Sequence, residues 1–357
     1  MRKFTFHFPN QFNLYSLLFI GLVFISMSLK AQTNEVKSLF TVLSELDDPR
    51  LTISTDLNLI MGDQKTEAEY PATVLVKDGK KELSSWDIKI THRGRFRRNI
   101  CNFPPLKLDF SRGQLKERGL AKFDKFKLVT HCLEDKLVGN ENVIREQVLY
   151  KLYNQVTPYS YRTLVIRVVY QDVNNPKNKI DRYAILIEPN SELEKRIEAK
   201  EEEGMMNPNR DKLDLAIENK VALFQYLIGN EDWSVQMMRN VKPFLSKASG
   251  KVILVPYDFD FSGMVKTSYA IPNADEGLSS IEERSFMGLA TSPEIFKANK
   301  LAYQQIHKAM EGEIKNTKKL SFEGKLYMRS YLASFYKELE TMEVPIYKEE
   351  GSPQEDK

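Results

Sequence analysis

Residues 252–263 read VILVPYDFDFSG and join an apolar run to two acidic side chains. The run is typical of a buried strand, and extended backbone would place Asp258 and Asp260 on one face of it. Their carboxylates would then lie roughly 6–7 Å apart. At an effective dielectric near 20, their repulsion would be about 2–3 kcal/mol. Such a pair persists if one acid keeps a proton, if a Lys or Arg side chain lies between the acids, or if a divalent cation binds them.

A second acidic segment lies upstream of this one. Residues 229–234 read GNEDWS, and Asn240 follows shortly after. Apolar residues at helical spacing between 213 and 228 predict a helix that ends at Gly229, so Asp232 lies on a loop anchored by a buried helix. Oxygen ligands from Asp and Asn suit Mg²⁺ or Mn²⁺ rather than zinc. The structural alternative is that the acids cap nearby backbone or pair with arginines such as Arg239.

The rest of the chain surrounds these segments with strands first and helices later. Alternating apolar and polar residues predict strands over 51–60, 73–77, 86–90, 106–110, 126–129, 164–170 and 183–187. Helical spacing predicts helices over 32–48, 142–152 and 213–228, and two or three more between 287 and 342. The charged residues 191–203 are interpreted as a solvated helix face. The fold class is therefore α+β, with a β-rich region over 32–190 containing one main helix and a helix-rich region over 191–345.

Composition excludes several protein classes. The 357 residues include 42% hydrophobic and 11% aromatic residues, which rules out disorder as the main state. The four His are scattered, and no GxSxG or HExxH motif is present, so the usual hydrolase and metalloprotease signatures are absent. The formal net charge is +3 and the basic clusters are small, which argues against nucleic-acid binding.

The two ends of the chain have the composition of processing and tail segments. Residues 1–31 begin with Arg2 and Lys3 and continue into an uncharged apolar run, which predicts a signal peptide and an exported protein, periplasmic, secreted or at the cell surface. An uncleaved membrane anchor is the alternative. Removing the segment takes away three basic residues and no acid, so the exported body has a net charge of about zero. The polar residues 346–357 are predicted to be a disordered tail.

Cys101 and Cys132 are the two cysteines of the chain. In an oxidising compartment they could pair, but two residues do not define a disulfide framework. The favoured interpretation is a pair of small, buried, free thiols, with a bridge as the alternative. Their spacing does not favour a zinc site.

A loop Asp after a helix, an Asn beyond it and an apolar strand ending in Asp is the order found in protein-kinase-like phosphotransferases. The sequence resembles the spore-coat CotH kinase family, an atypical kinase-like group with secreted bacterial members. The matching stretches are residues 93–95 with 104–108, 142–152, 230–233 and 256–260, and the resemblance spans roughly residues 50–310. It implies a two-lobed kinase-like architecture and phosphate transfer from ATP, with Mg²⁺ or Mn²⁺, to a Ser or Thr of a protein substrate.

The resemblance also assigns roles to the two acidic segments. Asp232 corresponds to the catalytic-loop acid, Asp258 to the metal-binding acid with Asp260 a close second, and Asn240 to the metal-binding Asn. Asn240 lies eight residues beyond Asp232, whereas ordinary protein kinases place it five beyond. The resemblance therefore predicts either a longer loop or a missing second ligand, because Met237 stands at the five-residue position.

Weaker sequence features support the assignment of the nucleotide-binding residues. A strand Lys that pairs with a helix Glu is expected, and Lys127 with Glu146 fits this order, with Lys107 as the rival lysine. Glu188, after the strand over 183–187, falls where a nucleotide hinge is expected. No GxGxxG loop is present. Arg93, Arg95, Arg97 and Arg98 are candidate anion binders in its place, although four arginines are more typical of a solvated strand edge.

Three hypotheses follow from these residues. The first is an exported kinase-like phosphotransferase. The second is a catalytically inactive member of the same fold that acts as a surface or scaffold protein. The third is a metal-dependent phosphohydrolase that uses Asp258 and Asp260 with water. The acceptor and the oligomeric state have no signal in the sequence.

Overall fold

The computed structural model describes residues 36–62, 66–94 and 96–343. Residues from Ser38 onward form one compact unit, and only this unit is described below. Its secondary structure is mixed, with a β-rich first part and helices dominating later, which confirms the α+β prediction. The predicted signal peptide and tail lie outside the described residues. The division into two lobes stays a prediction.

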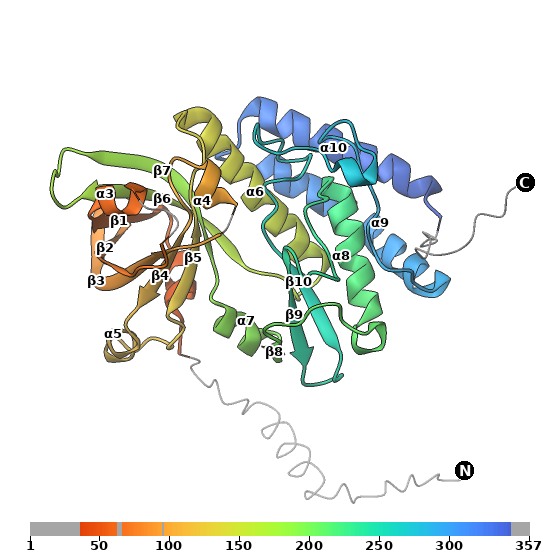
Figure 1. Ribbon diagram of the computed structural model, residues 1–357, viewed down its shortest axis with the longest axis horizontal. Coiled ribbons are helices and arrows are strands. Elements are labelled where there is room, and N and C mark those ends of the chain that lie inside the picture. Colours follow the sequence, from red (N-terminus) through yellow and green to blue (C-terminus); the bar gives the residue numbers. More distant parts are fainter. Residues whose placement is uncertain (1–35, 63–65, 95, 344–357) are drawn as a thin grey trace, which may run out of the picture. The chain divides into compact units, whose positions relative to one another are not determined.

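Seven strands close into a barrel (Figure 1). In spatial order they are β1 (Pro49–Thr55), β2 (Tyr70–Asp78), β3 (Lys81–His92), β4 (Leu106–Phe110), β5 (Lys125–Val129), β7 (Lys179–Ile187) and β6 (Thr163–Asp172). Neighbours pair antiparallel except β1 and β6, which are parallel and close the ring. The strands bury alternate side chains inside the barrel, as in β4, where Leu106, Leu108 and Phe110 are buried.

Four short helices accompany the barrel strands: α2 (Leu39–Ser44), α3 (Leu57–Gly62), α4 (Arg97–Ile100) and α5 (Arg112–Glu117). The predicted strand over 51–60 is wrong in its second half, which forms α3. Asp56 explains the change, because its carboxylate accepts the main-chain N–H groups of Asn58 and Leu59 and so starts a helix.

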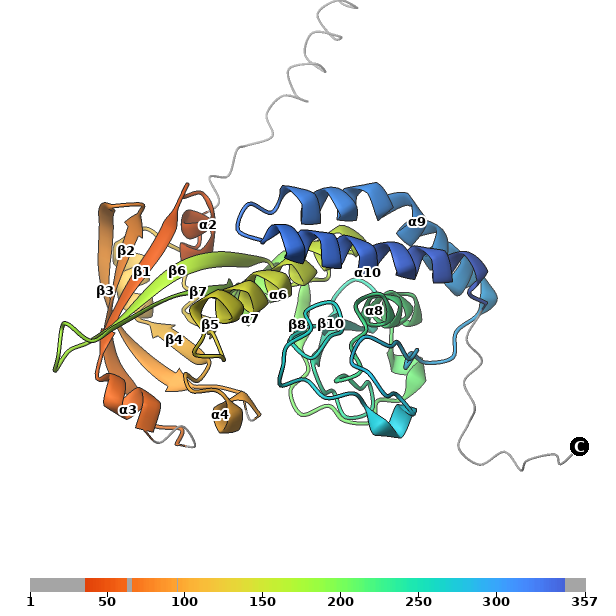
Figure 2. The ribbon, with the colours of Figure 1, turned by 90° about the horizontal axis from the view of Figure 1, so that it is seen from above.

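The main helix of the first part, α6 (Lys136–Val156), is flanked by the barrel and by later helices. Asp135 caps it by accepting the N–H groups of Leu137 and Val138. It packs against β7 on one side and against α9 (Pro293–Asn316) on another (Figure 2). Because α6 carries Glu146, these contacts fix the direction of that side chain.

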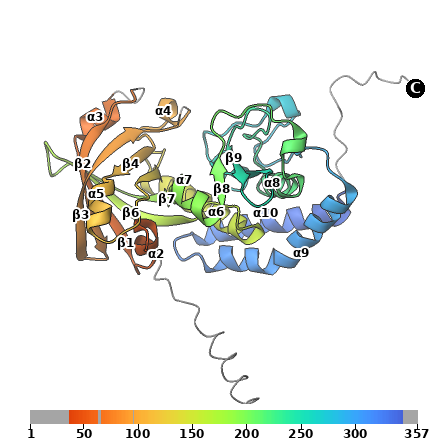
Figure 3. The same ribbon diagram turned by 90° about the horizontal axis from the view of Figure 1, so that it is seen from below.

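The remaining elements form a small sheet with helices (Figure 3). The sheet has the order β10 (Val252–Pro256), β9 (Val241–Ser246), β8 (Ala199–Glu201). The helices are α7 (Asn190–Arg196), α8 (Leu215–Ile228), α9 and α10 (Phe322–Thr341), with short 3₁₀ turns at Arg210–Lys212 and Ala274–Glu276. Strand β9 was not predicted, and it contains Pro243, a residue that is unusual within a sheet because it lacks a main-chain N–H. The charged residues 191–203, predicted as one helix face, form α7 and β8 instead.

Two steric reasons require glycine at position 229, the C-cap of α8. Gly229 has φ +61°, a conformation that favours glycine. A Cβ atom at this position would also collide with the hydroxyl group of Tyr331 on α10. The predicted helix stop is therefore confirmed, and it sets the start of the loop that carries Asp232.

The favoured prediction of free thiols is wrong, because Cys101 and Cys132 form a disulfide. Cys101 directly follows α4, and Cys132 lies between β5 and α6. Sequence could not show this, since the approach of the two segments depends on how β4 and β5 pair in the barrel.

No helix within the described ranges is long and apolar enough to cross a membrane.

Candidate active site

The loop after α8 holds Asp232 in a defined position. Asn230 is buried, its side-chain amide donates to Gln225, and its Oδ1 accepts the N–H of Asp232 at 3.1 Å. The Asp232 side chain is 36% exposed. The carboxylate is therefore fixed through its main chain while remaining accessible.

Asn240 reaches Asp232 despite the long spacing. Ser234 and Arg239 pair through two main-chain hydrogen bonds of 3.0 Å, which close the extra residues into a loop. Asn240 Nδ2 then donates to Asp232 Oδ2 at 2.9 Å and to the Asp232 carbonyl oxygen at 2.5 Å. Of the two predicted possibilities, the geometry is that of the longer loop.

The carboxylate of Asp232 is poised for proton exchange. Burial raises its pKa to about 6, although Arg239, whose Nε lies 3.3 Å from Oδ1, acts to lower the pKa. The structural alternative of pairing with Arg239 is thus partly realised. A carboxyl group with a pKa near neutrality is suited to general-base chemistry.

Asp258 and Asp260 do not lie on a strand as predicted. Strand β10 ends at Pro256, and Asp258 has φ +65°. Its main-chain N–H donates to the Tyr150 hydroxyl group on α6 instead of to a neighbouring strand. The two acids nevertheless converge, because both approach one guanidinium group.

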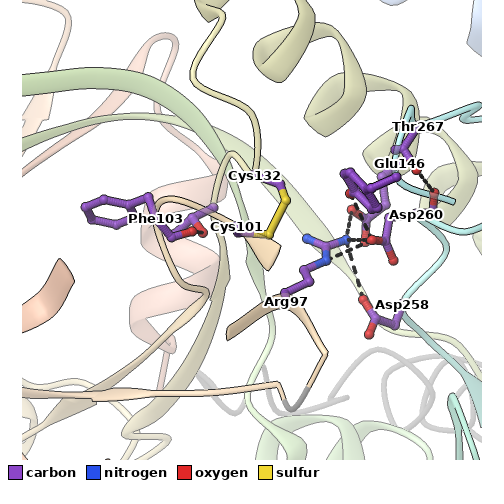
Figure 4. Close-up of a disulfide and its surroundings, with 10 residues drawn as sticks. Arg97, Cys101, Phe103, Cys132, Glu146, Asp258, Asp260 and Thr267 are labelled. Carbon is purple, nitrogen blue, oxygen red and sulfur yellow. Dashed lines mark hydrogen bonds and ion pairs between the residues drawn. A yellow bond between two sulfur atoms is a disulfide. The ribbon is translucent and has the colours of Figure 1, made fainter. Parts of the chain in front are cut away.

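That group belongs to Arg97, in the first turn of α4 (Figure 4). Its Nη2 lies 2.9 Å from Glu146 Oε2, 2.9 Å from Asp260 Oδ2 and 3.6 Å from Asp258 Oδ1. Its Nε also donates to Asp260 Oδ2 at 2.9 Å. The expectation of a solvated strand edge is therefore wrong for Arg97, which is only 7% exposed. Arg95 lies outside the described residues.

The charges in this cluster perturb one another. Burial by itself would lower the pKa of Arg97, but the carboxylates of Asp260 and Glu146 raise this pKa well above its usual value. Burial raises the pKa of Glu146 to about 7 against the lowering effect of Arg97, and burial together with Asp260 raises the pKa of Asp258. Without a further cation, Glu146 and Asp258 therefore keep their protons to a higher pH than exposed carboxyl groups do.

The predicted pair of Lys127 and Glu146 is not formed. Glu146 pairs with Arg97, whereas Lys127 Nζ donates to Asn190 Oδ1 at 2.7 Å. Burial, followed by the nearby charges of Arg93 and Lys242, lowers the pKa of Lys127 well below its usual value. Lys107 is half-buried on β4. The structure thus gives the helix Glu a partner from α4 instead of from a strand.

Glu188 belongs to a group of structural ion pairs. It is fully buried, and its two carboxylate oxygens pair with Arg162 at 2.9 Å and with Arg196 at 2.5 Å. Such a carboxylate fixes the chain after β7. The placement of Glu188 at a nucleotide hinge stays a prediction, and a nucleotide contact by its carboxylate would compete with both pairs.

A cleft of ≈ 940 Å³ connects the accessible site residues. Asp232, Asn240 and Asp258 line it, together with Arg93 and Arg239. The main chains beside Asn240 and Asp258 are joined, because the N–H of Tyr257 donates to the Asn240 carbonyl oxygen at 3.0 Å. The cleft therefore gathers a candidate base, a candidate amide ligand and a carboxylate.

The donor set fits Mg²⁺ or Mn²⁺ in chemistry. Carboxylate oxygens of Glu146, Asp258 and Asp260 all lie within 4.8 Å of one another, and Glu146 Oε1 has no hydrogen-bond partner among the described residues. The position between these three acids is already filled by Arg97. Asp258 is the acid of the cluster that also lines the cleft with Asn240, so these two residues could hold a divalent cation without displacing Arg97.

Sequence reasoning listed Arg97 among the anion binders but missed its role as partner of the acids. It also missed Tyr269, whose hydroxyl group donates to Asp260 Oδ2 at 2.9 Å. The available signal was the acid pair itself, which requires a cation between its members, but the sequence does not show which arginine supplies it.

No family model and no curated protein matches this chain. Among solved structures, the chain is similar to the crystal structure of a Helicobacter pylori proinflammatory kinase, CtkA. The TM-score is 0.37 with 11% sequence identity, over 65% of this chain and 90% of that chain. A likeness this low transfers neither fold nor activity, and the resemblance to the CotH family stays a prediction.

Proposed function

We propose that the protein transfers a phosphoryl group from a nucleotide such as ATP to a hydroxyl group of a protein Ser or Thr, with Mg²⁺ or Mn²⁺. The observation that carries the proposal is the hydrogen-bonded pair of Asp232 and Asn240, which lines one cleft with Asp258. A base, an amide oxygen and a carboxylate in this arrangement are the protein parts that phosphoryl transfer requires.

The residues divide the chemistry between them. Asp232 accepts the proton of the substrate hydroxyl group. The hydroxyl oxygen bonds to the terminal phosphorus atom, and the bond between that phosphorus and the nucleoside diphosphate breaks. Asp258 and Asn240 would hold the divalent cation, which when bound offsets the negative charge of the phosphates. Asp260 takes part through its contact with Arg97.

Anion binding falls to cations that face the cleft. Arg93 lines the cleft with Asp258, and Lys127 Nζ lies 5.5 Å from the ring centre of Tyr257, which also lines the cleft. In the proposed complex Arg93 contacts the nucleotide phosphates. The low pKa of Lys127 makes it the weaker of the two candidates.

Export belongs to the same proposal. The Cys101–Cys132 disulfide supports an oxidising compartment, since such bonds rarely persist in the cytosol. The acceptor would then be an exported or surface protein.

An inactive scaffold is the second candidate, and Arg97 is the observation that favours it. A cation among Glu146, Asp258 and Asp260 supplies charge compensation without any metal. A scaffold would keep the ion cluster for stability and bind no nucleotide.

Thermal unfolding of the purified full-length chain tests the proposal. We expect Mg²⁺ with ATP to raise the melting temperature more than either alone, and Asp258→Asn to abolish this joint effect. Asp87→Asn, on the exposed side of β3, is the matched control and keeps the effect. No shift under any condition would favour the scaffold, and phosphate release without a protein acceptor would favour a hydrolase.

A further inference from the structure

Arg97 is a buried charge whose position is dictated by carboxylates. A guanidinium group this far from water is stable only when its charge and its N–H groups are paired. Glu146 on α6 and Asp260 after β10 supply hydrogen bonds of 2.9 Å, and Asp258 lies 3.6 Å away. Two segments that are distant from α4 in sequence thus meet on the Arg97 side chain.

The main chain of Arg97 is fixed as firmly as its side chain. Its carbonyl oxygen accepts the N–H of Cys101 at 2.9 Å, and Cys101 is bonded to Cys132. Cys132 lies four residues before α6 begins. The disulfide therefore ties the turn that carries Arg97 to the segment that leads into the helix carrying Glu146 (Figure 4).

The carboxyl groups of the cluster outnumber the guanidinium group that contacts them. One guanidinium group faces three carboxylates, and Glu146 Oε1 is buried without a partner in the described part of the chain. One carboxylate oxygen each of Glu146 and Asp260 accepts a hydrogen bond from Arg97. The Asp258 side chain, by contrast, is 34% exposed and lines the cleft. The inner and outer acids thus differ in what they can still bind.

We propose that Arg97 is a built-in cation that takes the inner cation position between Glu146 and Asp260, so that the site accepts a divalent cation only at the cleft side of Asp258. The disulfide holds Arg97 in this position. The inference rests on the proposed function only in assuming that Asp258 binds a divalent cation. Arg97 is a positioning residue here, because it orders the acids and limits how many cations they bind.

Mn²⁺ titration of the purified full-length chain, without nucleotide, tests the proposal. Calorimetry and the electron paramagnetic resonance of free Mn²⁺ count the bound ions. We expect Arg97→Met to raise the number from about one to about two per chain, because Glu146 and Asp260 become available to a metal. Arg97→Lys keeps a cation and should restore the wild-type number. Arg98→Met, on the same turn, is the matched control and leaves the number unchanged.

A double variant covers the case in which Arg97→Met unfolds the protein. Arg97→Met with Glu146→Gln removes one charge of each sign, so it should fold and show no additional Mn²⁺. Arg97→Met alone should melt at a lower temperature than wild type in EDTA and recover in Mn²⁺. The proposal would be overturned if Arg97→Met alone bound no additional Mn²⁺ and its melting temperature did not rise when Mn²⁺ was added.

The disulfide provides an independent test. Cys101→Ser with Cys132→Ser should loosen the α4 turn and give partial occupancy of the additional Mn²⁺ position. If the doubly substituted chain bound Mn²⁺ as wild type does, the claim that the disulfide holds Arg97 in position would be wrong.

Failure of the proposed function is distinguishable from failure of this inference. If wild type binds no Mn²⁺ while Arg97→Met binds about one, Arg97 is the built-in cation of a site that is not a phosphotransferase centre. If wild type binds two, Arg97 does not limit the site, whatever the reaction.

Discussion

The contact between Asp232 and Asn240 shows how a single amide compensates for an unusual spacing. Eight residues separate the pair in sequence, yet Nδ2 of Asn240 lies 2.9 Å from Oδ2 of Asp232. The amide fixes the carboxylate orientation, and burial raises the pKa of Asp232 to about 6. Both effects prepare an acceptor for a hydroxyl proton near neutral pH.

Replacing Asp232 by Asn should abolish catalysis and spare binding. The amide keeps an acceptor for Asn240 but cannot accept a proton, so we expect phosphate transfer to fall by about 10²–10⁴-fold. Radiolabelled phosphate transfer measures the loss, and the joint melting shift with Mg²⁺ and ATP should remain. Asp211→Asn, an exposed acid, is the control. Unchanged transfer in Asp232→Asn would assign the base elsewhere.

Glu218, in the first turn of α8, makes stability depend on pH. Burial raises its pKa to about 7 from 4.5, against the hydrogen bond from the Leu289 N–H. Between these values the unfolded chain has lost a proton that the folded chain keeps. The free energy of unfolding should therefore fall by about 3 kcal/mol as the pH rises from 4.5 to 7.

Glu218→Gln should remove this dependence. We expect urea unfolding at pH 5 and pH 8 to give a smaller difference than in wild type, with the exposed Glu117→Gln as the control. An identical pH profile in Glu218→Gln would show that Glu218 does not titrate in this range.

At the scale of elements, predictability from sequence followed local pattern. The alternation of Leu106, Leu108 and Phe110 predicted β4 with its observed ends, and Gly229 predicted the end of α8. The strand over 258–260 was wrong, because φ +65° at Asp258 is set by the contact with Tyr150 on another element. The partner of Glu146 was missed for the same reason, since Arg97 reaches it only through the folded chain.

The end of α8 gives a prediction at this scale. Gly229→Ala should destabilise the protein by about 1–3 kcal/mol, since Gly229 has positive φ and its new Cβ atom meets the Tyr331 hydroxyl group. In the double variant Gly229→Ala with Tyr331→Phe, the part of the free-energy loss that comes from the collision should be recovered, and the part that comes from positive φ should remain. Chemical denaturation measures both. A fully additive loss in the double variant would contradict the proposed collision.

For the whole molecule, β7 joins two hydrophobic cores, as β5 does with Val129 in one core and Leu128 in the other. Ala184 and Leu186 belong to the barrel core, whereas Ile185 and Ile187 belong to the core of α6 and the later helices. Alternate side chains of one strand thus serve both cores. We infer that the two cores unfold together.

Leu186→Ala tests this cooperativity. The loss of a fully buried Leu should cost about 2–5 kcal/mol. The two tryptophans report the cores separately, because Trp86 lies in the barrel core and Trp233 in the other. In single-tryptophan variants, both fluorescence transitions should shift to lower urea by the same amount, and the exposed Leu83→Ala should shift neither. A shift seen only by Trp86 would show independent unfolding.

The parallel pairing of β1 with β6 also governs the order in which the chain can fold. Arg50 lies opposite Arg167, so the ring cannot close until β6, far along the chain, is in place. Contacts between such distant segments form slowly, because the intervening chain must first lose conformational freedom. An emerging chain therefore lacks a closed barrel until β6 and β7, which lies between β5 and β6 in the ring, have been synthesised. In the exported protein that we propose, this delay would leave the barrel open while the chain crosses the membrane.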